Sequence, residues 1–223
     1  MDVAVITGGS RGLGFELATA LAADGWEVVI DGRSATARAP RIHGVPGDVR
    51  DAGHRADLIR TAEELGELRL LINNASTLGP SPQPALAEYP LDVLREVYEA
   101  NVIAPVALTQ LALPALRRAH GTVVDITSDA AVEGYAGWGG YGSSKAALEQ
   151  VANVLAAEEP DVRVVWFDPG DMRTQMHQEA FPGEDISDRP LPATVVPVLL
   201  GLLRSDLPSG RYRAADLRIG AQS

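Results

Sequence analysis

The stretch DVAVITGGSRGLG, Asp2 to Gly14, decides the fold of this chain. An apolar run comes first, a glycine-rich turn follows at once, and a helical pattern continues from about Gly12 to Asp24. Further apolar runs without polar alternation lie at residues 27–31, 68–73, 121–127 and 162–167, with amphipathic stretches between them. Such strands are expected where helices cover both faces of a parallel sheet. The pattern therefore predicts an α/β fold in which residues 1–223 form one doubly wound domain.

The composition is that of an ordinary globular protein, with 46% hydrophobic and 22% charged residues. The chain has no cysteine, which excludes disulfides, thiolate metal sites and cysteine nucleophiles, and no metal site is predicted. A formal net charge of −11 argues against nucleic acid and anionic membranes as partners, because both need clustered positive charge. The N-terminal apolar run is expected to be a strand rather than a signal peptide, and the apolar run at 195–203 is too short to span a bilayer. We therefore expect a cytoplasmic protein.

The turn TGGSRGLG, residues 7–14, has the composition of a phosphate-binding loop. Glycines allow positive φ and a close approach of the backbone to a ligand, and a helix N-terminus offers free N–H groups to a pyrophosphate. The spacing of Gly8, Gly12 and Gly14 differs from G-x-G-x-x-G, and no Lys-Ser/Thr pair follows as in a P-loop. A glycine-rich turn without a ligand stays the alternative.

The stretch GYGSSKAALE, Gly140 to Glu149, holds an unusual residue. Lys and Arg together number 19, and Lys145 is the only lysine among them. Tyr141 precedes it by four residues, which places both side chains on one face of a helix. An ammonium ~5 Å from the phenol, at an effective dielectric of ~20, would favour the phenolate by about 3 kcal/mol, or about 2 pKa units. The pair therefore suits acid–base catalysis, with an ordinary surface Tyr–Lys pair as the alternative.

Five motifs in order resemble the short-chain dehydrogenase/reductase family. They are T-G-x-x-x-G-x-G from Thr7, NNA at residues 73–75, Ser128, Y-x-x-x-K from Tyr141, and Pro169-Gly170 followed by Thr174. The resemblance implies a Rossmann-type parallel sheet of about seven strands flanked by helices. It also implies binding of NAD(H) or NADP(H), hydride transfer between a small-molecule alcohol and its carbonyl, and a homodimer or homotetramer.

The resemblance assigns roles to four residues. Tyr141 would be the general acid/base, and Lys145 would lower its pKa and hold the nicotinamide ribose. Ser128 would hydrogen-bond the substrate oxygen, and Asn101 would order a water in the proton relay. Two plainer readings stay open: Ser128 as the cap of the turn after its strand, and Asn101 as a satisfied polar residue between helices.

The resemblance also predicts where the cofactor would bind. Asp48 would meet the adenine amine and Val49 its ring, although Asp48 could instead be the N-cap of the next helix. The full predicted set is Gly8, Ser10, Arg11, Gly12, Leu13, Gly14, Arg33, Asp48, Val49, Asn74, Ala75, Tyr141, Lys145, Pro169, Gly170, Met172 and Thr174. Two departures stand out. Ser76 replaces the glycine of the family's NNAG motif, and its side chain leaves less room for the backbone to approach the cofactor. The C-terminal strand, residues 210–216, is short, which weakens the expectation of a tetramer.

The end of the second strand, EVVIDGR, predicts which nicotinamide cofactor is used. By resemblance the position that selects NAD is Gly32, which has no carboxylate, whereas Arg33 stands where NADP-dependent members carry a basic residue. Arg11 is a second donor for a 2′-phosphate. NADP(H) is therefore favoured and NAD(H) stays possible, because Asp31 could accept hydrogen bonds from the adenosine ribose.

The expected activity is NADPH-dependent reduction of a ketone or aldehyde, or the reverse oxidation. Alternatives are a redox-silent cofactor sensor and an epimerase or dehydratase on the same fold. The predicted substrate residues are Ser128, Trp138, Tyr141, Met172 and His177, and they indicate an apolar substrate of moderate size. The Pro-, Gly- and acid-rich segment within residues 172–192 is a predicted substrate lid.

Overall fold

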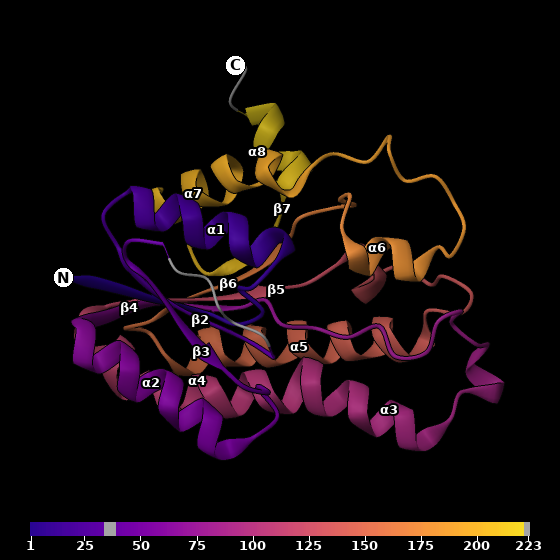
Figure 1. The fold of residues 1–223 in the computed structure, drawn as a ribbon, viewed down its shortest axis with the longest axis horizontal. Coiled ribbons are helices and arrows are strands. Elements are labelled where there is room, and N and C mark those ends of the chain that lie inside the picture. The colour runs from indigo at the N-terminus through magenta and orange to yellow at the C-terminus, as the bar shows by residue number, and fades with distance from the viewer. Residues whose placement is uncertain (34–38, 221–223) are drawn as a thin grey trace.

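The computed structural model describes residues 1–33 and 39–220, in which strands and helices alternate (Figure 1). The strands are β1 (Asp2–Ile6), β2 (Glu27–Gly32), β3 (Ile42–Pro46), β4 (Glu67–Asn73), β5 (Thr122–Ile126), β6 (Arg163–Asp168) and β7 (Gly210–Arg213). The helices are α1 (Gly12–Ala23), α2 (Ala52–Leu65), α3 (Leu91–Tyr98), α4 (Ala104–Ala119), α5 (Gly139–Glu158), α6 (Gln175–Ala180), α7 (Val196–Arg204) and α8 (Ala214–Gly220).

The seven strands form one sheet in the order β3-β2-β1-β4-β5-β6-β7, and every pairing is parallel. This confirms the predicted doubly wound, Rossmann-type sheet. The chain winds outward from β1 in one direction as far as β3 and then returns through β4 in the other direction. Ligands of such sheets bind at the carboxyl ends of the strands where this reversal occurs, here between β1 and β4.

Helices cover both faces of the sheet, with α1 and α7 on one side and α2, α4 and α5 on the other (Figure 1). Successive side chains of a strand point to opposite faces. Ile6 of β1 accordingly packs with Leu17 of α1, and Val5 packs with Leu58 of α2. Each fully buried aliphatic side chain stabilises the fold by roughly 1.5–3 kcal/mol. Burial on both faces explains why these strands are apolar without alternation.

Two strand predictions differ from the structure. β3, with sequence IHGVP, was not among the predicted apolar runs, because it lies at the edge of the sheet and buries only Ile42 fully. The predicted C-terminal strand ends at Arg213, since Ala214 begins α8. β7 nevertheless pairs with β6 over four residues and completes the sheet.

The helical run Leu91–Ala119 is long and apolar enough to cross a membrane by length and composition alone, but 61% of its most apolar window is buried inside the protein. It joins α3 and α4 through a π-helical turn, Glu99–Ile103. Turns of this kind are frequent at functional sites. Asn101 lies within this turn.

Candidate active site

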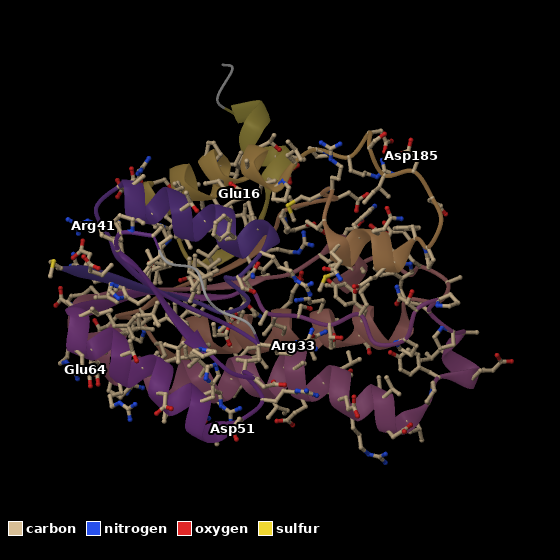
Figure 2. All side chains as sticks on the ribbon, viewed as in Figure 1. Glu16, Arg33, Arg41, Asp51, Glu64 and Asp185 are labelled. Carbon is tan, nitrogen blue, oxygen red and sulfur yellow. The ribbon has the colours of Figure 1, made fainter. Side chains whose placement is uncertain are left out.

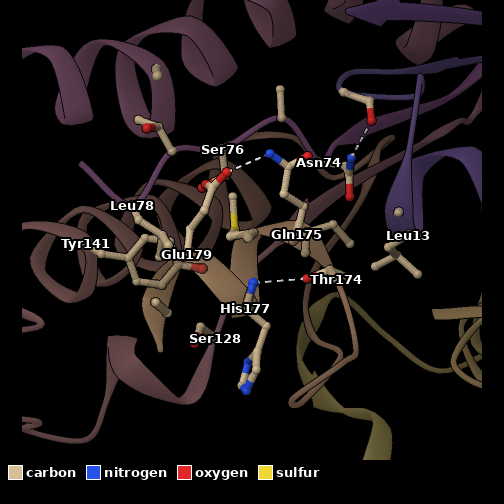
Figure 3. A pocket seen from close by; sticks show the side chains of 18 of the residues that line it. Leu13, Asn74, Ser76, Leu78, Ser128, Tyr141, Thr174, Gln175, His177 and Glu179 are labelled. Atoms are coloured by element: carbon tan, nitrogen blue, oxygen red, sulfur yellow. Dashed lines mark hydrogen bonds between the residues drawn. The ribbon is translucent and has the colours of Figure 1, made fainter. Parts of the chain in front are cut away.

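A cleft with a volume of about 1060 Å³ runs along the carboxyl ends of the strands. It brings together every predicted cofactor and substrate residue except Gly14, and every predicted catalytic residue except Asn101. In the close view of Figure 3, Tyr141, Ser128 and His177 lie around one end of the cleft, and Leu13 lies towards the other. Segments more than 100 residues apart in the chain thus share one cavity, as the motifs predicted.

The glycine turn has the conformation that its sequence predicts. Gly8 and Gly12 have φ of 64° and 57°, a region that residues with a Cβ rarely adopt. A Cβ on Gly14 would lie 2.6 Å from both Asn74 Nδ2 and the Gly8 carbonyl oxygen, so Gly14 permits the close packing of α1. Arg11 precedes α1 and gives no side-chain cap to its N-terminus. The first N–H groups of α1 therefore remain for an anion, and the turn fits a dinucleotide pyrophosphate.

Asp31 could also bind an adenosine ribose, but both of its carboxylate oxygens already have partners in the protein. It is 2% exposed, its Oδ1 accepts a hydrogen bond from the Gly8 N–H, and its Oδ2 lies 3.3 Å from His54 Nε2. Burial raises the pKa of Asp31, and the hydrogen bonds to Gly8 and His54 oppose that rise. One carboxylate oxygen of Asp31 thus holds the glycine turn, and the other holds His54 of α2. His54 was not predicted, because its contact with Asp31 depends on how α2 packs under β2.

The adenosine end of the cleft carries several arginines. Figure 2 shows Arg33 near the centre of the view. The Arg50 guanidinium, with Nη2 2.7 Å from Asp48 Oδ2, is the main cause that lowers the pKa of Asp48 to about 2, and the charge of Arg33 contributes to this shift. The N-cap of α2 is Asp51, which accepts from the His54 N–H, so the reading of Asp48 as that cap was wrong. Arg50 was missed by the sequence analysis and lines the same part of the cleft.

Tyr141 and Lys145 are both buried on α5, with exposed fractions of 7% and 2%. Lys145 Nζ donates to the Ile126 carbonyl oxygen at 2.8 Å and lies 5.6 Å from the centroid of the Tyr141 ring. Burial lowers the pKa of Lys145 to about 8. The surface-pair alternative is therefore wrong.

The pKa of Tyr141 differs from the expectation. Burial raises it well above its ordinary value, and the carboxylates of Asp168 and Asp129 add to this rise, whereas hydrogen bonds from Ser128 and Ser76 lower it. The predicted lowering of the Tyr141 pKa is therefore wrong for the protein alone. The prediction from the sequence assumed an effective dielectric of ~20 around Tyr141 and Lys145. Removal of the phenol from water disfavours the phenolate more strongly than the ammonium favours it under that assumption.

Ser128 lies beside Tyr141 and caps the short 3₁₀ turn Asp129–Ala131. Its Oγ accepts from the Ala130 N–H at 3.2 Å and donates to Asp129 Oδ1 at 2.9 Å. Tyr135 donates to the other oxygen of Asp129 at 3.0 Å. The capping alternative is therefore confirmed, and the same hydroxyl also faces the cleft.

Asn101 is fully buried and holds the loop after β4 against α5. Its Oδ1 accepts from Ser76 Oγ at 3.1 Å and from the Thr77 N–H at 2.9 Å, and its Nδ2 donates to the Thr77 carbonyl oxygen and to Ser144 Oγ, each at 2.9 Å. The reading of a satisfied polar side chain is confirmed. Ordering of a water by Asn101 stays a prediction. Ser76, the departure from NNAG, thus lies between Asn101 and Tyr141.

The other end of the cleft has aromatic walls. The ring centroid of Trp138 lies 5.7 Å from that of Tyr141 and 5.8 Å from that of Phe181, which in turn lies 4.9 Å from His177. His177 lies in the first turn of α6, and its N–H donates to Oγ1 of the N-cap residue Thr174 at 3.2 Å (Figure 3). Leu78 and Glu179 also line the cleft and were missed by the sequence analysis. Apolar rings around a proton donor suit a planar or apolar substrate.

Known proteins share this fold and its motifs. The short chain dehydrogenase family model matches residues 2–185. Sepiapterin reductase of Mus musculus is 35% identical over 202 residues, which cover 80% of this chain and 77% of that protein. The (S)-benzoin-forming benzil reductase of Saccharomyces cerevisiae is 32% identical over 194 residues, 79% of this chain and 74% of that one.

A solved structure adds to this likeness. The alcohol dehydrogenase from the archaeon Thermococcus sibiricus, complexed with 5-hydroxy-NADP, aligns with a TM-score of 0.83 and 26% identity over 96% of this chain and 95% of that one. The chain therefore belongs to the short-chain dehydrogenase/reductase family and is an oxidoreductase that acts on an alcohol/carbonyl pair with NAD(P).

Proposed function

We propose that the protein reduces a ketone or aldehyde with NADPH and catalyses the reverse oxidation of the alcohol. The observation that carries the proposal is the buried Tyr141–Lys145 pair beside Ser128, at the end of a cleft that begins at the glycine turn. Two relatives are named as reductases, a sepiapterin reductase and an (S)-benzoin-forming benzil reductase. The aromatic wall around Trp138 supports an apolar carbonyl substrate of this general kind here.

The residues of the cleft fit a nicotinamide dinucleotide. The turn from Gly8 to Gly14 and the uncapped N-terminus of α1 would hold the pyrophosphate, and Asp48 and Val49 would meet the adenine. Asn74 and Ala75 would lie along the cofactor, and Lys145 would bind the nicotinamide ribose. The nicotinamide end would be held by the segment after β6, with Pro169, Gly170, Met172 and Thr174.

Three features support NADPH over NADH. Arg33 and Arg11 line the adenosine half of the cleft with Ser10 and can bind a 2′-phosphate. Position 32 is Gly32, so no carboxylate stands there to select NADH. Asp31 is already engaged by Gly8 and His54. The Thermococcus sibiricus relative has been solved with an NADP derivative.

The proposed mechanism assigns one proton transfer to this chain. NADPH, when bound, supplies the hydride to the carbonyl carbon. Tyr141 gives its phenolic proton to the carbonyl oxygen, and its raised pKa keeps that proton in place at neutral pH. The Ser128 hydroxyl turns from Asp129 to the substrate oxygen and stabilises the charge that develops there. Lys145, buried next to the Tyr141 ring, would bind the nicotinamide ribose and so position the cofactor next to the phenol.

The proposal includes a lid, an assembly and a location. Residues 172–192 would close over the substrate, because Phe181 of this segment contacts Trp138 and His177 packs on Phe181. Ile103, Leu111 of α4 and Val154 of α5 are exposed apolar residues, and α4 and α5 cover the same side of the sheet, which supports a homodimer or homotetramer. The absence of cysteine fits a reducing compartment, and we place the protein in the cytoplasm.

A sensor and an epimerase or dehydratase are less well supported. A redox-silent sensor has no need of a buried proton donor, whereas the Ser128, Tyr141 and Lys145 set is complete. No separate observation favours an epimerase or dehydratase.

A carbonyl panel followed at the nicotinamide absorbance band tests the proposal. We expect oxidation of one NADPH per carbonyl reduced, and loss of this turnover in Tyr141→Phe. Conversion of a substrate without net NADPH consumption would instead indicate an epimerase or dehydratase. Tight NADPH binding with no turnover across the panel would indicate the sensor.

A further inference from the structure

Arg211 of β7 reaches three acceptors at the carboxyl ends of the strands. Its Nε donates to Glu149 Oε1 at 2.9 Å, and its Nη2 donates to the Ser128 carbonyl oxygen at 3.3 Å and to Asp168 Oδ2 at 3.4 Å. The exposed fractions of the Arg211, Glu149 and Asp168 side chains are 22%, 12% and 4%. The guanidinium of Arg211 therefore connects β7 to α5, to β6 and to Ser128, which lies two residues after the end of β5.

Each acidic partner of Arg211 holds a second group near the cleft. Glu149 Oε1 also accepts from Thr127 Oγ1 at 2.7 Å, directly before Ser128. Asp168 Oδ1 accepts from the Gly170 N–H at 2.9 Å, in the turn that follows β6. The Arg211 side chain thus holds the main chain of Ser128 directly, and it holds the Pro169–Gly170 turn through Asp168. Arg211 itself is not among the residues that line the cleft.

Arg211 also compensates a charge next to Tyr141. The carboxylates that raise the pKa of Tyr141 are those of Asp168 and Asp129, and Lys145 is the cation on its own helix. At Asp168, burial raises the pKa, Arg211 and Arg213 lower it, and Asp129 raises it. Arg213 is the weaker partner, with 3.8 Å between Nε and Asp168 Oδ2 and a side chain that is 53% exposed.

We propose that Arg211 is a positioning residue of the reaction. It fixes the main chain at Ser128 and at the turn after Asp168, and its charge offsets the Asp168 carboxylate beside Tyr141. This inference rests on the proposed roles of Tyr141 and Ser128. A purely structural ion pair between β7 and α5 would stabilise the fold but leave the pH dependence of turnover unchanged.

The first test compares Arg211→Gln with Arg213→Gln, the matched control two residues further on the same strand. Arg211→Gln removes all three hydrogen bonds and leaves Asp168 less compensated. We expect kcat/KM to fall at least about tenfold, the size expected for loss of charge-assisted hydrogen bonds. The pH at which alcohol oxidation gains activity should rise, because deprotonation of Tyr141 becomes harder next to a less compensated carboxylate. Arg213→Gln should show little of either effect, because an exposed charge is screened.

Two further variants separate charge from geometry. Asp168→Asn should move the same pH limb downward, and the double variant with Arg211→Gln should follow Asp168→Asn. Arg211→Lys keeps the charge, but its single nitrogen lacks the planar fork with which Nε and Nη2 of Arg211 reach their acceptors, so it should restore the pH limb better than it restores kcat. If Arg211→Gln does not fold, Arg211→Lys takes its place in the comparison with Arg213→Gln.

Hydrogen exchange of the protein without cofactor gives a readout that does not depend on turnover. Exchange should increase in peptides covering residues 127–131 and 168–174 of Arg211→Gln, and not in Arg213→Gln. Unchanged exchange in both segments would overturn the proposal, whether or not the protein turns over a carbonyl. A lower Tm with parental exchange, kcat/KM and pH profile would equally reduce Arg211 to a structural ion pair. A parent protein that is inactive on every carbonyl but shows the exchange difference would contradict the proposed function and leave the positioning role supported.

Discussion

At the scale of single residues, the site depends on two buried groups whose pKa values move in opposite directions. Burial raises the pKa of Tyr141 and lowers that of Lys145 to about 8. At neutral pH Tyr141 therefore holds the proton that a reductase must give away. The surrounding hydroxyls and carboxylates then tune how readily it leaves.

Replacement of Tyr141 by Phe removes the proposed proton donor and keeps the ring that packs on Trp138. Positioned acid–base catalysis contributes about 10²–10⁴-fold, so kcat should fall within that range. The Tm should stay near that of the parent, as measured by calorimetry. Combination with Lys145→Met should add little, because the two residues act as one unit. Parental turnover in Tyr141→Phe would remove this residue from the mechanism.

Ser76→Gly restores the residue of the family's NNAG motif and removes a hydroxyl that lowers the pKa of Tyr141. The pH limb of alcohol oxidation should therefore move to higher pH, as measured by kcat/KM from pH 6 to 10. Ser143→Ala is the matched control, since Ser143 is exposed and donates to the Gly140 carbonyl oxygen at 3.2 Å. An identical profile in the parent and in Ser76→Gly would separate Ser76 from the chemistry.

Arg33→Ala tests the choice of cofactor. Charge-assisted hydrogen bonds to a 2′-phosphate contribute roughly 1.5–3 kcal/mol, so the parent should bind NADPH at least tenfold more tightly than NADH. Most of that preference should disappear in Arg33→Ala, as measured by fluorescence titration. Arg41→Ala is the control, because Arg41 pairs with Glu27 at 2.9 Å outside the cleft. Equal affinity of the parent for both cofactors would contradict the assignment.

At the scale of elements, the short helix α6 connects the two ends of the cleft. Gln175 of α6 accepts a hydrogen bond from Arg11 in the glycine turn, and the Glu179 carbonyl oxygen accepts from Ser81 Oγ at 2.6 Å. These contacts come from opposite sides of the cleft. A helix of six residues has little internal stability, so its placement depends on such contacts.

The segment of residues 172–192 should therefore gain protection from hydrogen exchange when NADPH and substrate are added. Its Pro-, Gly- and acid-rich part buries little apolar surface by itself, whereas Phe181 and Met176 can close on an apolar substrate. Exchange should be measured for the protein alone, with NADPH, and with both ligands. The helix α2, which lies outside the substrate end, is the internal control. Equal protection in all three states would show that this segment is not a lid.

At the scale of the whole molecule, buried acids shape the stability. Asp125 is buried in the interior strand β5 next to Asn73, and burial raises its pKa from 3.8 to about 6. The folded protein then binds more protons than the unfolded chain between these two values, so stability falls as pH rises through about 6. Asp48 acts in the opposite sense, since its pKa of about 2 gives stability that is lost only below about pH 4.

The free energy of unfolding should therefore be larger at pH 5 than at pH 7.5, with Asp125 contributing about 1.4 kcal/mol to the difference. Urea unfolding at the two pH values measures the difference. Asp125→Asn keeps the acceptor for Asn73 and should remove most of it, whereas Asp206→Asn on the surface should not. Equal stability of the parent at both pH values would contradict the assigned burial of the Asp125 charge.

The sequence by itself determined the alternation of strands and helices, the glycine turn and most of the predicted residues that meet in the cleft. These follow from local periodicity and from motifs whose spacing places each residue at the carboxyl end of a strand. It did not determine the contacts of Asp31 with His54, of Arg50 with Asp48, or of Arg211 with Glu149 and Asp168. It also misjudged the pKa of Tyr141, whose shift depends on complete burial. Only the tertiary structure decided these features, because desolvation and long-range hydrogen bonds depend on which distant segments pack together, and no local pattern of residues encodes that packing.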